Sequence, residues 1–143
     1  MSTLERAIAI AAEAHAGQVD KADSCYILHP IRVMLSVSTL EERIVAVLHD
    51  VCEDCPDWSL DRIRSEGFSE TIVAALESVT KRKDEDGDEG YFVFVRRAAS
   101  NPIGRRVKLA DLQDNLDIGR IRNPTQRDYD RIERYRRAIS MIQ

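Results

Sequence analysis

Apolar residues recur at the spacing of an α-helix along most of this 143-residue sequence, and this period constrains the fold more than any other feature. In the first segment, Leu4, Ala7, Ile8 and Ala11 would share one helical face. No two segments alternate convincingly as paired strands, and no internal repeat or second domain is evident. The sequence therefore predicts an all-α fold, a single compact bundle of about seven to nine short helices over residues 1–143.

Proline, glycine and capping residues divide this pattern into helices separated by short breaks. The segments expected to be helical are 3–16, 30–37, 41–54, 59–64, 69–79, 90–99, 103–119 and 124–142. Residues 81–90 (KRKDEDGDEG) are polar and lack apolar periodicity, which predicts an exposed, mobile loop. Its acidic spacing does not make a calcium loop, because Glu89 stands where that pattern needs Gly and Val95 where it needs Glu.

Composition and charge exclude several classes of protein. The chain has no apolar run of transmembrane length and no basic-then-apolar leader, so we expect a cytoplasmic protein that does not contact a membrane. Residues 1–90 carry 9 basic and 19 acidic side chains, whereas residues 91–143 carry 12 and 6. An acidic half suits a metal and a basic half suits an anion, but attraction between two halves of one domain explains the asymmetry equally well.

The arginine-rich segment at 127–137 (RDYDRIERYRR) raises the question of nucleic-acid binding. Acidic residues interrupt its positive charge and the whole chain is acidic, so we expect no nucleic-acid partner. Most of these arginines are predicted to form a solvated helix face. Cys52 and Cys55 form a C-x-x-C at the end of an apolar stretch, where packing is a better interpretation than redox chemistry.

The stretch IVAVLHDVCED, residues 44–54, places ionisable side chains inside a run that is otherwise typical of a core. A carboxylate is costly to bury unless it is paired, hydrogen-bonded or bound to a metal. His49 and Asp50 are adjacent, and Asp50, Glu53 and Asp54 lie three or four residues apart on one helical face. Three carboxylates this close repel one another unless a divalent cation lies among them.

Two further positions carry side chains that could complete such a site. His29 precedes a proline, which favours an extended backbone at the start of a helix, and it reads equally well as a ligand or as a packed residue. Asp111 and Asn115 lie one turn apart on a segment that is otherwise largely apolar. The competing interpretation is a solvated polar stripe, which the nearby Asp114 and Asp117 favour.

The order H…HD…D resembles the HD-domain metal-dependent phosphohydrolases, and the surrounding segments narrow the resemblance to the RelA/SpoT-type alarmone hydrolases. The similar segments, which follow the family's order over roughly residues 4–120, are AHAGQVDKADSCYILHP, VLHDVCEDC, SVTK and VKLADLQDN. The resemblance implies an all-α fold and a bound divalent metal, commonly Mn²⁺. It implies that the metal ligands are His29, His49, Asp50 and Asp111.

The resemblance also implies a reaction, the hydrolytic removal of the 3′-pyrophosphate from guanosine tetra- or pentaphosphate. Glu53 and Asp54 match the family's catalytic acidic pair, placed to take a proton from an attacking water. Lys21 matches a phosphate-contacting lysine, and Asn115 matches an active-site asparagine. The expected partner is therefore a small phosphorylated molecule, with a nucleotide as the best candidate.

Several positions depart from the family's pattern without touching the implied ligands. Asp20 stands where the family has an arginine, and a carboxylate there would oppose a bound phosphate. Gln113 and Asp114 replace a Leu-His pair, and Ile118 replaces a threonine. The alternative to an enzyme is a non-catalytic nucleotide-binding or regulatory module on a retained HD fold. The acidic pair favours the enzyme, because a binding module has less need of a group that activates water.

Overall fold

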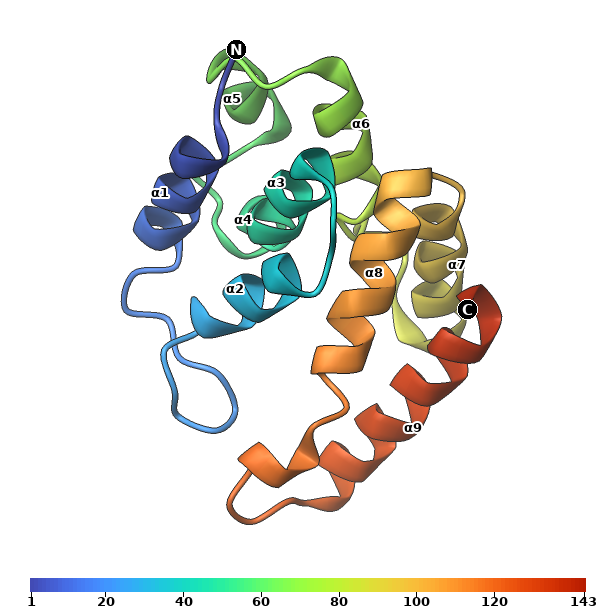
Figure 1. Cartoon of the computed structure of the whole chain (residues 1–143). Coiled ribbons are helices and arrows are strands. Elements are labelled where there is room, and N and C mark those ends of the chain that lie inside the picture. Colours follow the sequence, from blue (N-terminus) through green and yellow to red (C-terminus); the bar gives the residue numbers. More distant parts are fainter.

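The computed structural model describes all 143 residues, as nine α-helices and one 3₁₀-helix (Figure 1). The helices are α1 (Leu4–Ala14), α2 (Leu28–Leu35), α3 (Leu40–Leu48), α4 (Val51–Asp54), α5 (Leu60–Ser65), α6 (Glu70–Ser78), α7 (Gly87–Ala99), α8 (Pro102–Asp114), η1 (Ile118–Arg120) and α9 (Gln126–Ile142). Extended pairing is limited to one isolated bridge, between Val19 and Cys25. The predicted all-α fold is confirmed.

The segment 41–54, expected to be one helix, is two helices with a break at His49 and Asp50. Nδ1 of His49 lies 2.6 Å from the carbonyl oxygen of Ala46, which an unbroken helix would offer to the N–H of Asp50. A side chain that competes for a carbonyl interrupts the helical ladder. The break therefore coincides with the two residues that the sequence singles out as ligands.

The start of α2 also differs from expectation. The helix begins at Leu28, two residues before Pro30, so His29 is helical rather than extended. The N–H groups of a first helical turn have no partner within the helix, so a proline at the third position sacrifices no hydrogen bond. His29 therefore lies on a regular helix that packs on α3 and α8.

The polar segment 81–90 is largely exposed, but its description as one loop was wrong in two respects. Helix α7 begins at Gly87, inside the segment. Glu85 is only 4% exposed, because its carboxylate accepts hydrogen bonds from Arg97 at 2.8 and 3.1 Å. The mobility of the segment stays a prediction.

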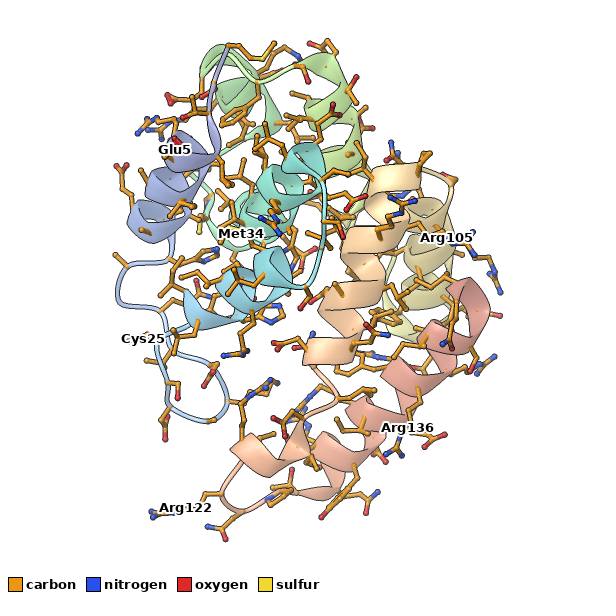
Figure 2. The ribbon with its side chains drawn as sticks, in the orientation of Figure 1. Glu5, Cys25, Met34, Arg105, Arg122 and Arg136 are labelled. Carbon is orange, nitrogen blue, oxygen red and sulfur yellow. The ribbon has the colours of Figure 1, made fainter.

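The apolar side chains form two clusters that share α8. The larger cluster has 23 buried residues, mostly from α1 to α6, and includes Val107 and Ala110 of α8. The smaller has 7 buried residues from α7, α8 and α9, including Leu112. Side chains fill the space on both sides of α8 in Figure 2. Helix α8 thus presents one face to each cluster.

No helix of the protein combines the length and the apolar character that crossing a bilayer requires. The cytoplasmic location and the assignment of residues 1–143 to a single domain stay predictions from the sequence.

Candidate metal centre and active-site pocket

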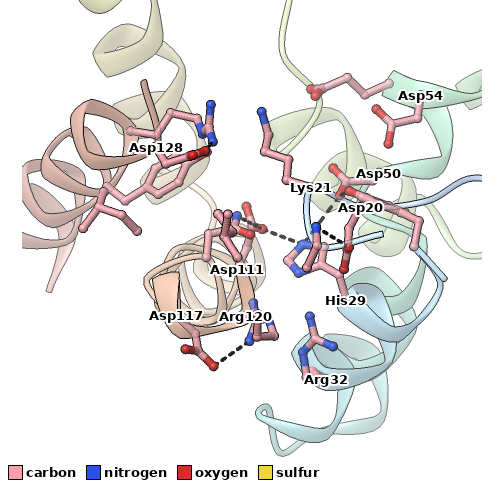
Figure 3. Close-up of a pocket in the computed structure, with 18 of the residues that line it drawn as sticks. Asp20, Lys21, His29, Arg32, Asp50, Asp54, Asp111, Asp117, Arg120 and Asp128 are labelled. Carbon is pink, nitrogen blue, oxygen red and sulfur yellow. Dashed lines mark hydrogen bonds and ion pairs between the residues drawn. The ribbon is translucent and has the colours of Figure 1, made fainter. Parts of the chain in front are cut away.

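The four residues predicted as metal ligands come together from three parts of the chain, α2, the α3–α4 break and α8. Figure 3 labels three of them, His29, Asp50 and Asp111. Oδ1 of Asp111 lies 2.9 Å from Nε2 of His29 and 3.4 Å from Nε2 of His49. Oδ2 of Asp50 lies 3.0 Å from Nε2 of His49 and 3.7 Å from Nε2 of His29. Donor atoms bound to adjacent positions of one octahedral ion lie about 3 Å apart, so these spacings fit a single divalent ion.

The hydrogen bonds of the two imidazoles determine which ring nitrogen faces the centre. Nδ1 of His49 donates to the carbonyl of Ala46 at 2.6 Å, and Nδ1 of His29 donates to Oδ2 of Asp114 at 2.6 Å. Each Nε2 therefore carries a lone pair that faces a carboxylate oxygen. Nε2 of His49 is buried without a hydrogen-bond partner. Lone pairs in this arrangement repel one another unless a cation or a proton lies between them, so the donor set fits a divalent metal.

The pKa values in the centre reflect the same demand for positive charge. Burial lowers the pKa of His49, but the nearby carboxylates of Asp50 and Asp111 raise it more, and the pKa lies well above its ordinary value. Burial raises the pKa of Asp111, but Lys108 and the imidazoles lower it more, and the pKa lies well below its ordinary value. The donors are therefore most stable with positive charge among them, which a divalent ion supplies.

Asp114 contacts the predicted ligand His29, a role that the sequence analysis missed because it counted Asp114 only in favour of a solvated stripe and as a departure from the family's pattern. Its carboxylate accepts from Nδ1 of His29 at 2.6 Å and from Nε and Nη2 of Arg32 at 2.8 and 3.0 Å. A carboxylate on the far nitrogen of a ligating histidine fixes the ring and its tautomer. Its spacing of three residues from Asp111 was the available signal, because such residues share a helical face.

Two more side chains that support the ligands were also missed. Lys108 is buried and its Nζ donates to Oδ2 of Asp111 at 3.0 Å, while it also lies over the ring of Phe94. The hydroxyl of Tyr26 donates to Oδ2 of Asp50. Lys108 stands three residues before Asp111, and Tyr26 stands three residues before His29. Sequence spacing alone does not reveal which way either side chain faces.

Glu53 and Asp54 lie on α4 and face the pocket beside the metal centre (Figure 3 labels Asp54). Oε1 of Glu53 accepts from the backbone N–H of Lys81 at 2.9 Å, and Oδ2 of Asp54 accepts from Nε2 of Gln18 at 3.1 Å. Desolvation by the pocket walls raises the pKa of both carboxyls above their ordinary values, although these hydrogen bonds oppose the shift. Neither side chain makes a hydrogen bond or ion pair with the predicted ligands, so the pair is distinct from the donor set.

The pocket has a volume of about 530 Å³, a size that suits a small molecule. Lys21, Arg131 and Arg134 also line the pocket, and the two arginines belong to α9, which lies across from Asp50 and Asp54 in Figure 3. Figure 3 shows Lys21 extending toward the space between Asp54 and α9. Burial lowers the pKa of Lys21 most, and repulsion from Arg131 lowers it further. Lys21 and Arg131 therefore lie close enough to interact.

The sequence analysis expected most of the arginines of α9 to be solvated. Arg127, Arg136 and Arg137 are exposed, in agreement with that expectation. Arg131 and Arg134 instead face the pocket, and Arg134 lies over the ring of Tyr91 at 4.3 Å from its centre. The 3.6-residue period places both residues on one side of the helix, but the sequence alone does not say which element that side meets.

Of the remaining positions that the sequence analysis named, Asp20 and Asn115 line the pocket and Gln113 and Ile118 do not. Asp20 lines the pocket, and its Oδ1 accepts from the N–H groups of Ala22 and Ser24 at 2.8 and 3.0 Å, so this carboxylate closes its own loop. Asn115 also lines the pocket, and its Nδ2 donates to Oδ1 of Asp111 at 3.1 Å. Gln113 and Ile118 are not among the lining residues.

The fold and the site together define a class of protein, the helical bundles whose paired histidines and aspartates hold a divalent metal. A family model described as an HD domain matches residues 7–102, well over half of the chain. The chain therefore belongs to the HD domain family. The matched segment includes His29, His49 and Asp50 and ends before Asp111.

Named relatives narrow the comparison to one group of enzymes within the family. A guanosine-3′,5′-bis(diphosphate) 3′-pyrophosphohydrolase of Aquifex aeolicus is 33% identical over 121 residues, which are 79% of this chain and 17% of that protein. The bifunctional (p)ppGpp synthase/hydrolase SpoT of Escherichia coli is 27% identical over 136 residues, 87% of this chain and 19% of SpoT. A GTP pyrophosphokinase of Streptomyces coelicolor is 30% identical over 122 residues, 79% of this chain and 14% of that protein. The chain spans less than a fifth of each, and these matches confirm the resemblance to the RelA/SpoT-type hydrolases.

Proposed function

We propose that this protein is a metal-dependent phosphohydrolase that removes the 3′-pyrophosphate from guanosine 3′,5′-bis(diphosphate) nucleotides. The observation that carries the proposal is the position of Glu53 and Asp54, two carboxylates outside the donor set that face a pocket also lined by Lys21, Arg131 and Arg134. The names of the relatives from Aquifex aeolicus and Escherichia coli support the choice of substrate.

We assign the metal ligands to His29, His49, Asp50 and Asp111. Donor atoms of His29, His49 and Asp111 lie within 4.8 Å of one another. Asp50 falls outside that group of three, and we include it because its Oδ2 lies 3.0 Å from Nε2 of His49. Two imidazoles and two carboxylates form a mixed nitrogen and oxygen set, which suits Mn²⁺ with open positions. A divalent ion bound there would act as a Lewis acid toward the scissile phosphate and lower the pKa of water.

The protein's own groups divide the remaining work. Glu53 and Asp54 accept the proton of the attacking water, a task for which raised pKa values suit them, because a stronger base takes up a proton more readily. The cations that line the pocket, Lys21, Arg131 and Arg134, bind the substrate's phosphates that lie away from the metal. A bis(diphosphate) nucleotide carries negative charge at two separate positions, which matches a pocket with a metal centre on one side and cations on the other.

The test is pyrophosphate release from guanosine 3′,5′-bis(diphosphate) with Mn²⁺ by the wild-type protein and by Glu53→Gln and Asp54→Asn. We expect kcat to fall by about 10²- to 10⁴-fold in at least one variant, because an amide cannot take up the proton. Metal content and nucleotide affinity should stay at wild-type values. Glu41→Gln, which changes an exposed glutamate at the start of α3, is the matched control.

Two results would contradict the proposal. Unchanged kcat in both variants would place the base elsewhere. A wild-type protein that binds the nucleotide with Mn²⁺ and leaves it intact would be the non-catalytic module that the sequence analysis keeps as its alternative.

A further inference from the structure

The third histidine of the chain, His15, lies outside the metal centre and has no role in the proposed function so far. It follows the last residue of α1 and is 2% exposed. Its Nδ1 lies 2.9 Å from Oε1 of Gln18, and Nε2 of Gln18 donates to Oδ2 of Asp54 at 3.1 Å. Two consecutive hydrogen bonds therefore connect a buried imidazole to one of the two candidate catalytic carboxylates.

The direction of these hydrogen bonds follows from the chemistry of the carboxylate. An ionised Asp54 can only accept, so the amide of Gln18 must present its NH₂ group to it. The amide then presents its oxygen to His15, which must donate through Nδ1–H. The neutral ring consequently has a bare Nε2, and Nε2 is the atom of His15 that is buried without a partner. A buried lone pair without a partner is tolerated better than a buried N–H without one.

The surroundings hold both side chains in place. The ring of His15 packs on the ring of Tyr26, with 4.9 Å between the centres. The backbone N–H of Gln18 donates to the carbonyl of His15 at 2.9 Å, and the carbonyl of Gln18 accepts from the N–H of Tyr26 at 2.9 Å. Gln18 is thus fixed at its backbone and at both ends of its amide. By contrast, Asp54 ends α4, a helix of only 4 residues, which restrains it little.

We propose that His15 and Gln18 are positioning residues that orient Asp54 for proton transfer. By holding Oδ2, the amide leaves Oδ1 as the oxygen available to the attacking water in the pocket. This inference rests on the proposed role of Asp54. It predicts that loss of the His15–Gln18 pair lowers kcat and leaves KM unchanged, because neither residue is one of the cations proposed to bind the phosphates.

The first test does not depend on activity. Long-range ¹H–¹⁵N NMR spectra of the wild-type protein should show His15 as the neutral Nδ1–H tautomer. In Gln18→Leu, which has no amide to accept from the ring, this tautomer should lose its preference. His15 as the Nε2–H tautomer in the wild-type protein would overturn the proposal, whether or not the protein hydrolyses the nucleotide.

The second test compares kcat and KM for guanosine 3′,5′-bis(diphosphate) in four variants. His15→Phe keeps a ring but removes the donor, and Gln18→Leu removes the amide; both should lower kcat by about ten- to a hundredfold with KM within about twofold. His15→Asn keeps an N–H near the position of Nδ1 and should recover most of the loss. Gln113→Leu, at an exposed glutamine off the pocket, is the control.

Thermal unfolding and Mn²⁺ content, measured on each variant, separate positioning from damage to the fold or the metal centre. Wild-type kcat in both His15→Phe and Gln18→Leu would overturn the positioning role while leaving the proposed function intact. An equal loss in His15→Phe and His15→Asn would overturn it as well, because the donor would then be irrelevant. A wild-type protein without hydrolysis would instead refute the proposed function, and the tautomer would still be readable.

Discussion

Replacing Asp114 with Asn removes the negative charge behind His29 and keeps the shape of the side chain. Oδ2 of Asp114 accepts from Nδ1 of His29 at 2.6 Å and from Nη2 of Arg32 at 3.0 Å, and Oδ1 accepts from Nε of Arg32 at 2.8 Å. An asparagine has an acceptor oxygen on one side and an NH₂ donor on the other, so it cannot accept all three of these hydrogen bonds. Either His29 loses its orienting partner or the guanidinium loses its two-point contact.

The expected effect is on metal affinity. Removing the group that orients a ligating histidine weakens metal binding by about 10- to 100-fold, which corresponds to about 1.4–2.7 kcal/mol at 25 °C. The bond to His29 is short and the carboxylate largely excluded from water, at 12% exposure of its side chain, so we expect the upper half of this range.

The assay is calorimetric titration of the metal-free protein with Mn²⁺, supported by competition with a chelating dye. Asp117→Asn is the matched control, since this carboxylate is 56% exposed and pairs with Arg120 rather than with a histidine. An affinity of Asp114→Asn within twofold of the wild-type value would refute the reasoning, because His29 would then need no orienting charge. A similar loss in Asp117→Asn would refute it too, since it would point to a general effect of charge.

Two further predictions concern proton binding and the buried ion pair. The pKa values of Glu53 and Asp54 lie above their ordinary values of 4.5 and 3.8, and the ionised forms are the ones proposed to accept a proton. The kcat of the metal-loaded enzyme should therefore fall as the pH drops through these raised pKa values. A kcat that stays level down to pH 4 would contradict this prediction. Arg97→Leu strands the buried carboxylate of Glu85 and should lower the free energy of unfolding in urea by about 3–5 kcal/mol, whereas the exposed Arg96→Leu should change it by less than about 0.5 kcal/mol. Arg97 lowers the pKa of Glu85, so its contribution is present above the unfolded pKa near 4.5 and is lost as the pH falls through the folded value; the two variants should therefore converge in acid.

The sequence was sufficient for the features that depend on local periodicity and on short motifs. Helical spacing identified every α-helix longer than four residues, with boundaries that moved by a few residues at α2 and α7. The helix expected to run to residue 119 ends at Asp114, and a separate 3₁₀-helix follows at Ile118–Arg120. The donor set of His29, His49, Asp50 and Asp111 followed from resemblance to a family, and the structure brings these four side chains together. Such a motif can be recognised in a sequence because each predicted ligand lies in a short segment that is similar to the family's own segment.

What the sequence could not supply depends on contacts between distant segments. The break between α3 and α4 arises where the ring of His49 takes the carbonyl of Ala46, a competition that helix propensity does not describe. Asp114 was counted as a departure from the family's pattern, yet it holds His29, because α2 and α8 pack together. The expectation that most arginines of α9 are solvated did not say that Arg131 and Arg134 face the pocket, since nothing in the chain says that α9 borders it.

The division of the apolar side chains into two clusters has a consequence for how proteins of this architecture diversify. The proposed ligands His29, His49 and Asp50 lie on α2 and at the break between α3 and α4, helices that pack in the larger cluster, whereas Arg131 and Arg134 belong to α9, which packs in the smaller one. Substitutions in α9 would therefore change the cations that line the pocket and leave the packing around the proposed ligands as it is. Helix α8 is the exception, because it serves both clusters and is therefore the element least free to drift.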